Sequence, residues 1–369
     1  DFKVKSGIEA TNIVEGLGSI TSGTKGQTGL FSATTYTGTG STQTITTGID
    51  LSGSNDGLVW IKGRSDAYSN YLHDTTSSQP WHFLSSNATS ARNTNSGNQN
   101  LTISAFNSTG FVAGSGSGIN NGWGGNNSTF VAWTWKKAAG FFDVVTYTGN
   151  FTAGKTVSHN LGSVPGMIII KDTSNTRNWI VYHRSIGEGK FLKLNATDAE
   201  TSNTFNFNNT APTSTQFTLG ESTNTNTNGA TYVAYLFAHN EDGGISCGSW
   251  DSVENTAPAV NIGFQPQFVM IKRSDGTGDW RVYDTARGIT DADDNELEWN
   301  TSDAEVTSAD RLDLTTSGFT STLGNGASGV SHIYMAIGSQ VTTASLDLST
   351  GSVFNFTPTA NPEVTLTNP

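Results

Sequence analysis

The sequence predicts an all-β chain of three tandem antiparallel β-sandwich repeats of a jelly-roll-like kind. One recurring stretch carries most of this prediction. Residues 58–62 (Leu-Val-Trp-Ile-Lys) return as residues 167–171 and again as 268–272, each time as a short apolar run that ends in a lysine. Each run is too short for an ordinary helix and is rich in β-branched or aromatic side chains, which predicts a buried strand. The lysine-to-lysine spacings are 171 − 62 = 109 and 272 − 171 = 101 residues, a period that indicates tandem domains.

Composition is the second observation in favour of this fold class. The 369 residues include 42 glycines, and only 14% of them are charged. Thr, Ser and Asn are abundant, which suits pleated surfaces and turns. A disordered chain is the alternative for so polar a sequence. However, 34% of the residues are hydrophobic and 10% are aromatic, and they fall in regular short runs that can form a core in each repeat.

The remaining strands of each repeat are short and are separated by turn residues, as in antiparallel sandwiches. In the first repeat, strands are expected at 35–38, 58–62, 71–74, 81–87, 106–111 and 130–135. In the second, they are expected at 146–149, 167–171, 179–183, 192–195, 215–220 and 232–237. In the third, they are expected at 248–250, 261–264, 268–272, 280–284, 297–300, 317–320 and 333–337. The closing strands suggest a constant register, since Phe130, Tyr232 and Tyr334 are each 102 residues apart.

These elements divide the chain into five units, with the repeats expected to be strung in series. The lead-in, residues 1–29, shows weak strand alternation at Phe2, Val4 and Ile8. In the last unit, residues 345–351 and 353–356 predict a β-hairpin, and residues 364–366 add a third strand. The units are a lead-in or stalk at 1–29, repeats at 30–137, 138–242 and 243–340, and the start of a further β segment at 341–369.

Charge and cysteine content exclude several classes of function. The formal charge is 19 − 31 = −12 with a pI near 4.8, and no basic run exceeds Lys136-Lys137, so nucleic acid is not an expected partner. No apolar run approaches the roughly 20 residues of a membrane helix, so membrane insertion is not expected. The single cysteine, Cys247, excludes a disulfide framework and is expected to be a small buried residue rather than a nucleophile.

Two acidic pairs are the first candidates for chemistry. Asp198 and Glu200 recur as Asp303 and Glu305 at the same distance from an Asn-x-Thr/Ser triplet, whereas the first repeat has Arg92 there. Residues two apart on an extended chain point to one face, so each pair could hold a cation or perform acid–base work. Because the first repeat breaks the pattern, we expect these acids to be structural or to bind a cation weakly. No catalytic residue and no cofactor are therefore predicted.

A denser acidic cluster is the candidate metal site. Asp291, Asp293, Asp294 and Glu296 offer oxygen ligands at short spacing, which suits Ca²⁺. The cluster lacks the glycine of a helix–loop–helix calcium loop, so a solvated loop is the alternative. The histidines show no metal-ligand spacing. His183 has Asp284 as its counterpart in the third repeat, so it is expected to be a hydrogen-bonding group at the surface.

Tryptophans are candidates for stacking against sugar rings. Trp179 and Trp280 recur at equivalent places and are expected in the core. Trp123 stands alone in the glycine-rich stretch 114–127 and is the glycan-binding candidate. Asn-x-Ser/Thr triplets, which are either glycosylation acceptors or the product of chance in so polar a chain, begin at Asn87, Asn107, Asn195 and Asn300.

Several strings resemble a repeated β-domain of virion structural proteins from marine tailed phages, including phages of cyanobacteria. They are residues 147–150, 159–171, 179–183, 194–200 and 232–238, and the resemblance extends over about residues 31–340. Residues 346–361 resemble a segment of fibre-type phage proteins, in which more chain usually follows. The third repeat departs at 261–264, and the first departs at 90–92 and in its glycine-rich loop.

The resemblance implies an extracellular virion protein without enzymatic activity, either a tail fibre or a head-attached fibre. Its implied partners are other virion proteins and a host-surface glycan or protein receptor. Two alternatives remain open, a polysaccharide-degrading enzyme on the appendage and a secreted bacterial adhesin. Fibre analogy also favours a homotrimer. The polar end segments carry apolar residues that need cover, namely Val4, Ile8, Leu346, Leu348, Val353, Phe354 and Phe356.

Overall fold

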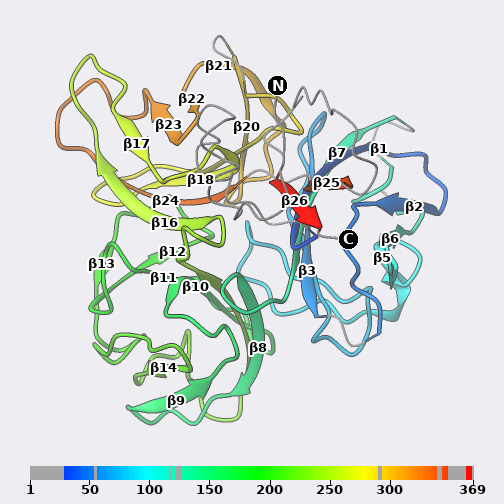
Figure 1. Cartoon of the computed structure of the whole chain (residues 1–369). Helices are drawn as coiled ribbons and strands as arrows, with labels where there is room; N and C mark the ends of the chain where they lie inside the picture. Colours follow the sequence, from blue (N-terminus) through cyan, green and yellow to red (C-terminus); the bar gives the residue numbers. More distant parts are fainter. Residues whose placement is uncertain are drawn as a thin grey trace, which may run out of the picture.

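The computed structural model confirms an all-β chain. It describes residues 29–53, 56–116, 118–121, 127–289 and 293–338, together with the backbone of two strands at 343–347 and 363–367. Three lobes, each built from one repeat, lie around a common centre (Figure 1). No helix in the described residues is long and apolar enough to cross a membrane.

Each repeat pairs a larger antiparallel sheet with a smaller one. In the first repeat the larger sheet has the order β1 (Phe31–Thr37), β7 (Thr129–Lys136), β3 (Gly57–Gly63), β4 (Tyr71–Asp74). The smaller sheet has the order β2 (Gln43–Thr46), β6 (Gly110–Ala113), β5 (Ile103–Asn107). A short 3₁₀ turn, η2 (Ser96–Asn98), precedes β5.

The second and third repeats use the same plan, with further strands added at one edge of the larger sheet. In the second repeat the larger sheet has the order β8 (Phe142–Thr148), β15 (Thr231–Ala238), β10 (Pro165–Asp172), β11 (Ile180–His183), β12 (Lys190–Lys193), β13 (Thr201–Ser202), and the smaller sheet pairs β9 (Lys155–Ser158) with β14 (Gln216–Leu219). In the third repeat the larger sheet has the order β16 (Ile245–Asp251), β24 (Ser331–Gly338), β18 (Pro266–Arg273), β19 (Trp280–Asp284), β20 (Asp294–Glu298), β21 (Val306–Ala309). Its smaller sheet has the order β17 (Ala259–Asn261), β23 (Gly318–Ser321), β22 (Leu312–Thr315).

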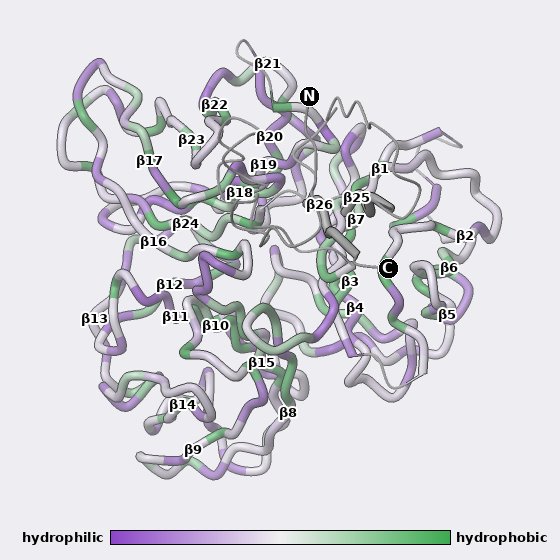
Figure 2. Tube along the Cα trace, viewed as in Figure 1, coloured by the Kyte–Doolittle hydropathy of each residue, from purple (hydrophilic) through white to green (hydrophobic). Residues whose placement is uncertain are grey.

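The recurring apolar runs are β3, β10 and β18, and their burial explains why they do not alternate with polar residues. In β3, Trp60 faces the centre of the molecule, while Val59 and Ile61 face the small sheet of their own repeat. In β18, Met270 faces the centre and Ile271 faces its own sandwich. A strand that is buried on both faces needs apolar side chains at successive positions. Figure 2 shows the corresponding hydrophobic stretches along β10 and β15.

The register of the closing strands differs from the expected constant spacing. Lys62 pairs with Val131, Lys171 with Val233, and Lys272 with Ile333. The equivalent positions are therefore separated by 233 − 131 = 102 and 333 − 233 = 100 residues. Matching Tyr334 to Tyr232 was wrong, because the second and third closing strands are two residues closer together in sequence than the first and second. His332 takes the place that Tyr232 has in the second repeat.

The sequence suggested that the repeats are strung in series, but the structure packs them together. One continuous hydrophobic core joins side chains from all three repeats. At its centre Trp60 stacks on Trp299 with ring centroids 4.0 Å apart, and Trp135 meets both Phe237 and Phe268 edge-on. Aromatic pairs of this kind add stabilisation beyond the apolar area that they bury. The three sandwiches therefore form a single packed unit.

At the end of the chain, β25 (Thr343–Asp347) and β26 (Glu363–Thr367) pair in parallel. The predicted third strand, residues 364–366, is therefore a partner of the first. The hairpin between residues 345–351 and 353–356 stays a prediction. Residues 353–356 and the lead-in 1–28 lie outside the described residues.

Candidate functional site

Three equivalent contacts join the repeats head to tail, and we call each contact zone a seam. The amide of Arg92 in the first repeat donates to the carbonyl of Thr173 in the second, at 3.0 Å. The backbone amide of Glu200 in the second donates to the carbonyl of Ser274 in the third, at 2.7 Å. The backbone amide of Glu305 in the third donates to the carbonyl of Arg64 in the first, at 2.8 Å, so the three seams close a ring.

A second set of equivalent residues strengthens each seam. Trp179 donates its indole N–H to the carbonyls of Ser85 and Ala88, both at 3.0 Å. Trp280 donates to the carbonyl of Lys193 at 3.0 Å, and Asn70 donates through its amide to Thr301 at 2.9 Å. Both tryptophans are fully buried, as the sequence predicted. Their burial serves the contact between repeats as well as the core.

The third set explains the histidine that alternates with aspartate. Asp74 accepts a hydrogen bond from Tyr235 of the next repeat, and Asp284 accepts one from Trp133, at 2.9 and 2.8 Å. At the equivalent place His183 lies 3.0 Å from the backbone carbonyl of Tyr334. The strand position that carries Trp133 and Tyr235 is Met335 in the third repeat, which has no side-chain donor. The surface role expected for His183 was therefore wrong, because the side chain is buried in a seam.

The Asn-x-Ser/Thr triplets have an internal role that the sequence did not reveal. The side chains of Asn87, Asn195 and Asn300 each accept a hydrogen bond from a backbone amide at the start of β4, β11 and β19, respectively. The distances are 2.9 Å from Asn70, 2.8 Å from Trp179 and 2.8 Å from Trp280. Recurrence at one position in all three repeats was the available signal.

Three of the four residues in the acidic pairs are engaged in ion pairs. Asp198 binds Lys193 at 2.7 Å and Glu200 binds Lys190 at 2.5 Å. Glu305 binds Arg64 and Arg287 at 2.7 and 3.0 Å, almost fully buried. Asp303 is exposed, and the described contacts bring it into no pair with Glu305. These carboxylates hold loops together.

The structure describes three of the four acidic residues in the candidate metal cluster. Asp294 accepts the backbone amides of Arg311 and Leu312, at 2.8 and 2.6 Å, and burial raises its pKa to about 6. Glu296 binds Arg281 and Arg311 at 3.1 and 3.2 Å. Asp293 directly precedes β20, and Asp291 lies outside the described residues. Within the described part of the chain, no group of three His, Cys, Asp or Glu side chains is placed to hold a metal ion.

Cys247 and Trp123 complete the sequence-predicted candidates. Cys247 is fully buried and its thiol lies 3.6 Å from the carbonyl of Ala238, and burial raises its pKa to about 12. The expectation of a small buried residue is confirmed. Trp123 lies outside the described residues.

The three lysines that end the recurring strands are buried and cap loop carbonyls. Lys62 donates to Tyr68 at 2.6 Å, Lys171 to Asp172 at 2.7 Å, and Lys272 to Arg273 at 2.6 Å. Burial lowers the pKa of each to about 8. Lys272 also donates across its seam to Thr197, at 3.2 Å.

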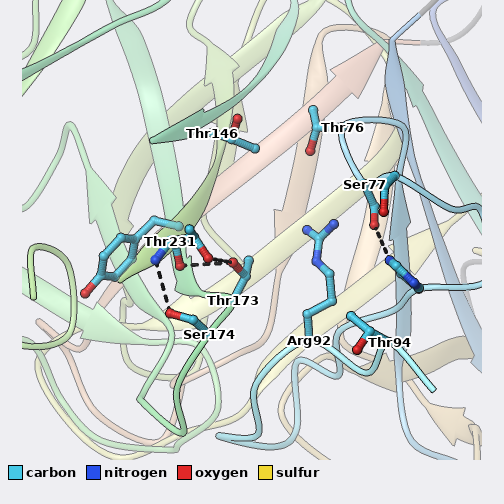
Figure 3. A pocket seen from close by; sticks show the side chains of 11 residues that line it. Thr76, Ser77, Arg92, Thr94, Thr146, Thr173, Ser174 and Thr231 are labelled. Atoms are coloured by element: carbon cyan, nitrogen blue, oxygen red, sulfur yellow. Dashed lines mark hydrogen bonds between the residues drawn. The ribbon is translucent and has the colours of Figure 1, made fainter. Parts of the chain in front are cut away.

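The seam between the first and second repeats contains a pocket of about 310 Å³. Figure 3 shows Arg92 extending into it between Ser77 and Thr173. Nine of the eleven lining side chains carry a hydroxyl group, and this pocket was not predicted because its two walls are far apart in sequence. The lining residues are Thr76, Ser77, Ser78, His82, Arg92, Thr94, Thr146, Thr173, Ser174, Thr231 and Tyr232.

The fold and its seams define a class, a single-chain ring of three β-sandwich repeats. The chain belongs to the family described as domain of unknown function DUF7483, whose profile matches residues 27–340. That range covers all three repeats as one unit. No curated protein and no solved structure matches the chain.

Proposed function

We propose that this chain is a non-enzymatic structural protein of a phage virion, a tail fibre or head-attached fibre that displays β-sandwich repeats to the host surface. The observation that carries the proposal is that three of the four acidic residues with recurring spacing are occupied in ion pairs. Glu305, for example, binds two guanidinium groups and is almost fully buried. Carboxylates held in this way are poorly suited to the paired acid–base chemistry of glycosidases, so the arrangement supports attachment over hydrolysis.

The resemblance to marine phage virion proteins supports the same proposal through its residues. Its strings form strands and seam residues here: 167–171 is within β10, 179–183 leads into and includes β11, and 194–200 reaches the seam at Glu200. They are thus the residues that the ring requires. Fold-level likeness is analogy, so the function has to be tested on the particle.

Localisation tests the proposal directly. Antibody raised against the purified chain should label intact phage particles, and it should reduce their adsorption to host cells. A host-produced protein absent from purified particles would contradict the virion assignment and favour the adhesin alternative. The enzyme alternative is tested separately. Purified protein should release no reducing ends from host polysaccharide, and release that is lost in Glu200→Gln would overturn the non-enzymatic assignment.

We also propose a homotrimer in which residues 1–29 and 341–369 contribute to the shared axis. β25 and β26 pair with each other in parallel, and a two-stranded sheet is too small to be stable alone. Native mass measurement should give about three times 39.0 kDa. A monomer in dilute buffer would contradict the trimer, and a chain lacking 341–369 that stays trimeric would remove the role of that segment.

A further inference from the structure

Two equivalent carboxylates bind arginine, but in different ways. In the third repeat the side chain of Arg287 is fully buried, and its guanidinium donates four hydrogen bonds. It donates to Asp284 at 2.6 Å, to Glu305 and the carbonyl of Asn295 at 3.0 Å, and to the carbonyl of Val282 at 2.7 Å.

In the first repeat, Arg92 binds the equivalent carboxylate, Asp74, at 2.6 Å and retains spare donor capacity. Its side chain is 10% exposed and lines the pocket. Its buried Nε makes no hydrogen bond within the described part of the chain. The two terminal nitrogens, which carry four N–H groups, bond only to Asp74 within the described part of the chain, at 3.5 and 2.6 Å. The guanidinium therefore keeps donors for a ligand acceptor in the pocket.

We propose that the pocket between the first and second repeats binds one ring of a neutral saccharide, with Arg92 and the surrounding hydroxyls as its hydrogen-bonding groups. This inference rests on the proposed host-attachment function and specifies its ligand class and its location. It also moves the glycan site away from the stretch around Trp123. The site is specific to this seam, since the counterparts of Arg92 in the other two are Glu200 and Glu305.

Charge favours a neutral ligand over an anion. Asp74 compensates Arg92 directly. Of the other titratable groups of the lining, burial lowers the pKa of His82 and raises that of Tyr232, so both are neutral at pH 7. The whole chain carries −12, which repels anions at long range. A sulfate or uronate would therefore gain little from the guanidinium.

The lining hydroxyls supply donors and acceptors in a fixed frame. Thr173 and Thr231 join their hydroxyls at 2.8 Å across two strand ends, and Ser174 accepts the amide of Thr231 at 3.1 Å. The hydroxyl of Thr173 already donates to the carbonyl of Thr231, so Thr173 and Thr231 offer acceptor sites to a ligand. Ser174 donates to Asp172 and accepts from Thr231 and Asn175, so its hydroxyl serves the frame alone. Acceptors on these threonines and donors on Arg92 together complement sugar hydroxyls, which both donate and accept.

The small size of the pocket predicts weak binding. A volume of about 310 Å³ is at the lower end of ordinary ligand sites. Because the pocket exposes little lining surface, each site buries little area and should bind a single sugar only at millimolar concentration. Several copies on one particle would raise the overall affinity through multivalency.

Titration with D-glucose, D-galactose, D-mannose and N-acetylglucosamine, followed by saturation-transfer NMR on the full chain, tests the site. At least one of these sugars should bind. Thr173→Val removes one lining hydroxyl and should weaken binding about fivefold, as expected for one lost hydrogen bond. Arg92→Lys keeps a cation beside Asp74 but removes Nε, and should weaken binding similarly.

Ser274→Ala is the matched control. Ser274 occupies the position of Thr173 in the neighbouring seam, where its hydroxyl donates to Ser331 as that of Thr173 does to Thr231. The affinity of the Ser274→Ala variant for the sugar should equal that of the unmodified chain. Binding that survives in both pocket variants, absence of binding to all four sugars, or a preference for sulfate or glucuronate would each overturn the proposal. None of these outcomes bears on whether the chain is found in the virion, so the two proposals fail separately.

Discussion

The hydroxyl of Tyr235 in the second repeat donates a hydrogen bond of 2.9 Å to the carboxylate of Asp74 in the first, with both side chains buried. The counterpart bond runs from Trp133 in the first repeat to Asp284 in the third, at 2.8 Å. The seams are thus specified by polar pairs as well as by apolar packing. Their energies can be measured one seam at a time.

Tyr235→Phe should lower the free energy of unfolding by about 1.5–3 kcal/mol, because it removes a hydrogen bond to a buried charged group. Urea denaturation measures the change. Tyr147→Phe is the control, since the hydroxyl of Tyr147 bonds only to a backbone carbonyl of its own repeat, that of Thr225 at 2.8 Å. Equal losses in the two variants would contradict a special role for the seam.

Asn195→Ala should cost about 1–3 kcal/mol, because the buried amide of Trp179 loses its acceptor. Asn107→Ala removes another Asn-x-Thr triplet, but the side chain of Asn107 accepts only from Thr109 in an exposed turn. That control should change stability by less than about 0.5 kcal/mol. A similar cost at both positions would show that the triplet itself, rather than its place in the repeat, is what matters.

Acid should destabilise the chain through its buried histidines. Burial lowers the pKa of His73, His183 and His332 from 6.5 to about 4. Between these values the unfolded chain binds more protons, so stability is fully present above pH 6.5 and is lost as the pH falls towards 4. The pKa values of Asp294 and Glu298, which burial raises, oppose this trend. His183→Gln should reduce the slope of unfolding free energy against pH, and an unchanged slope would contradict the assignment.

Mild alkali should act in the opposite sense through the three buried lysines. Their pKa of about 8 lies below the ordinary 10.5, so the unfolded chain binds more protons above pH 8 and stability rises with pH there. The rise is cleanest between pH 8 and 9, before the raised pKa of Cys247 begins to oppose it. Lys171→Met should remove about a third of the slope, measured by urea denaturation across that interval.

Residues 138–242 expressed alone should fail to form a stable monomer. Removing the neighbours would expose Trp179 and Phe237, which are fully buried, together with the strand β10 that faces the common core. The chain spanning 27–340 should unfold in one cooperative transition. A well-dispersed NMR spectrum from the isolated repeat would contradict the single-core arrangement.

The strands could be predicted from sequence because they depend on local patterns. The runs ending at Lys62, Lys171 and Lys272 are buried strands, as their β-branched and aromatic content indicated. The seams could not be predicted, since equivalent places are taken by chemically different residues. Asn70 stands where the other repeats have Trp179 and Trp280, and all three donate to a neighbouring repeat.

The candidate site was missed for a related reason. Arg92 was noticed as the residue that breaks the acidic pattern, but its contact with Thr173 joins two segments that no local pattern connects. The deviation from the repeat was the available signal. It marks where one seam acquired a different chemistry. The glycan candidate Trp123 lies outside the described residues, as does Asp291 of the metal candidate, whereas Asp294 and Glu296 of that cluster are bound to groups of the chain itself.

Head-to-tail contacts with threefold closure are ordinarily made by separate subunits, and such assemblies dissociate on dilution. Here the peptide links at residues 137–141 and 239–244 make each closure an intramolecular event. The effective concentration of one repeat for the next is then set by the short linker rather than by the amount of protein. The ring persists in a single molecule at any dilution, and each interface can mutate without copying its change to the other two.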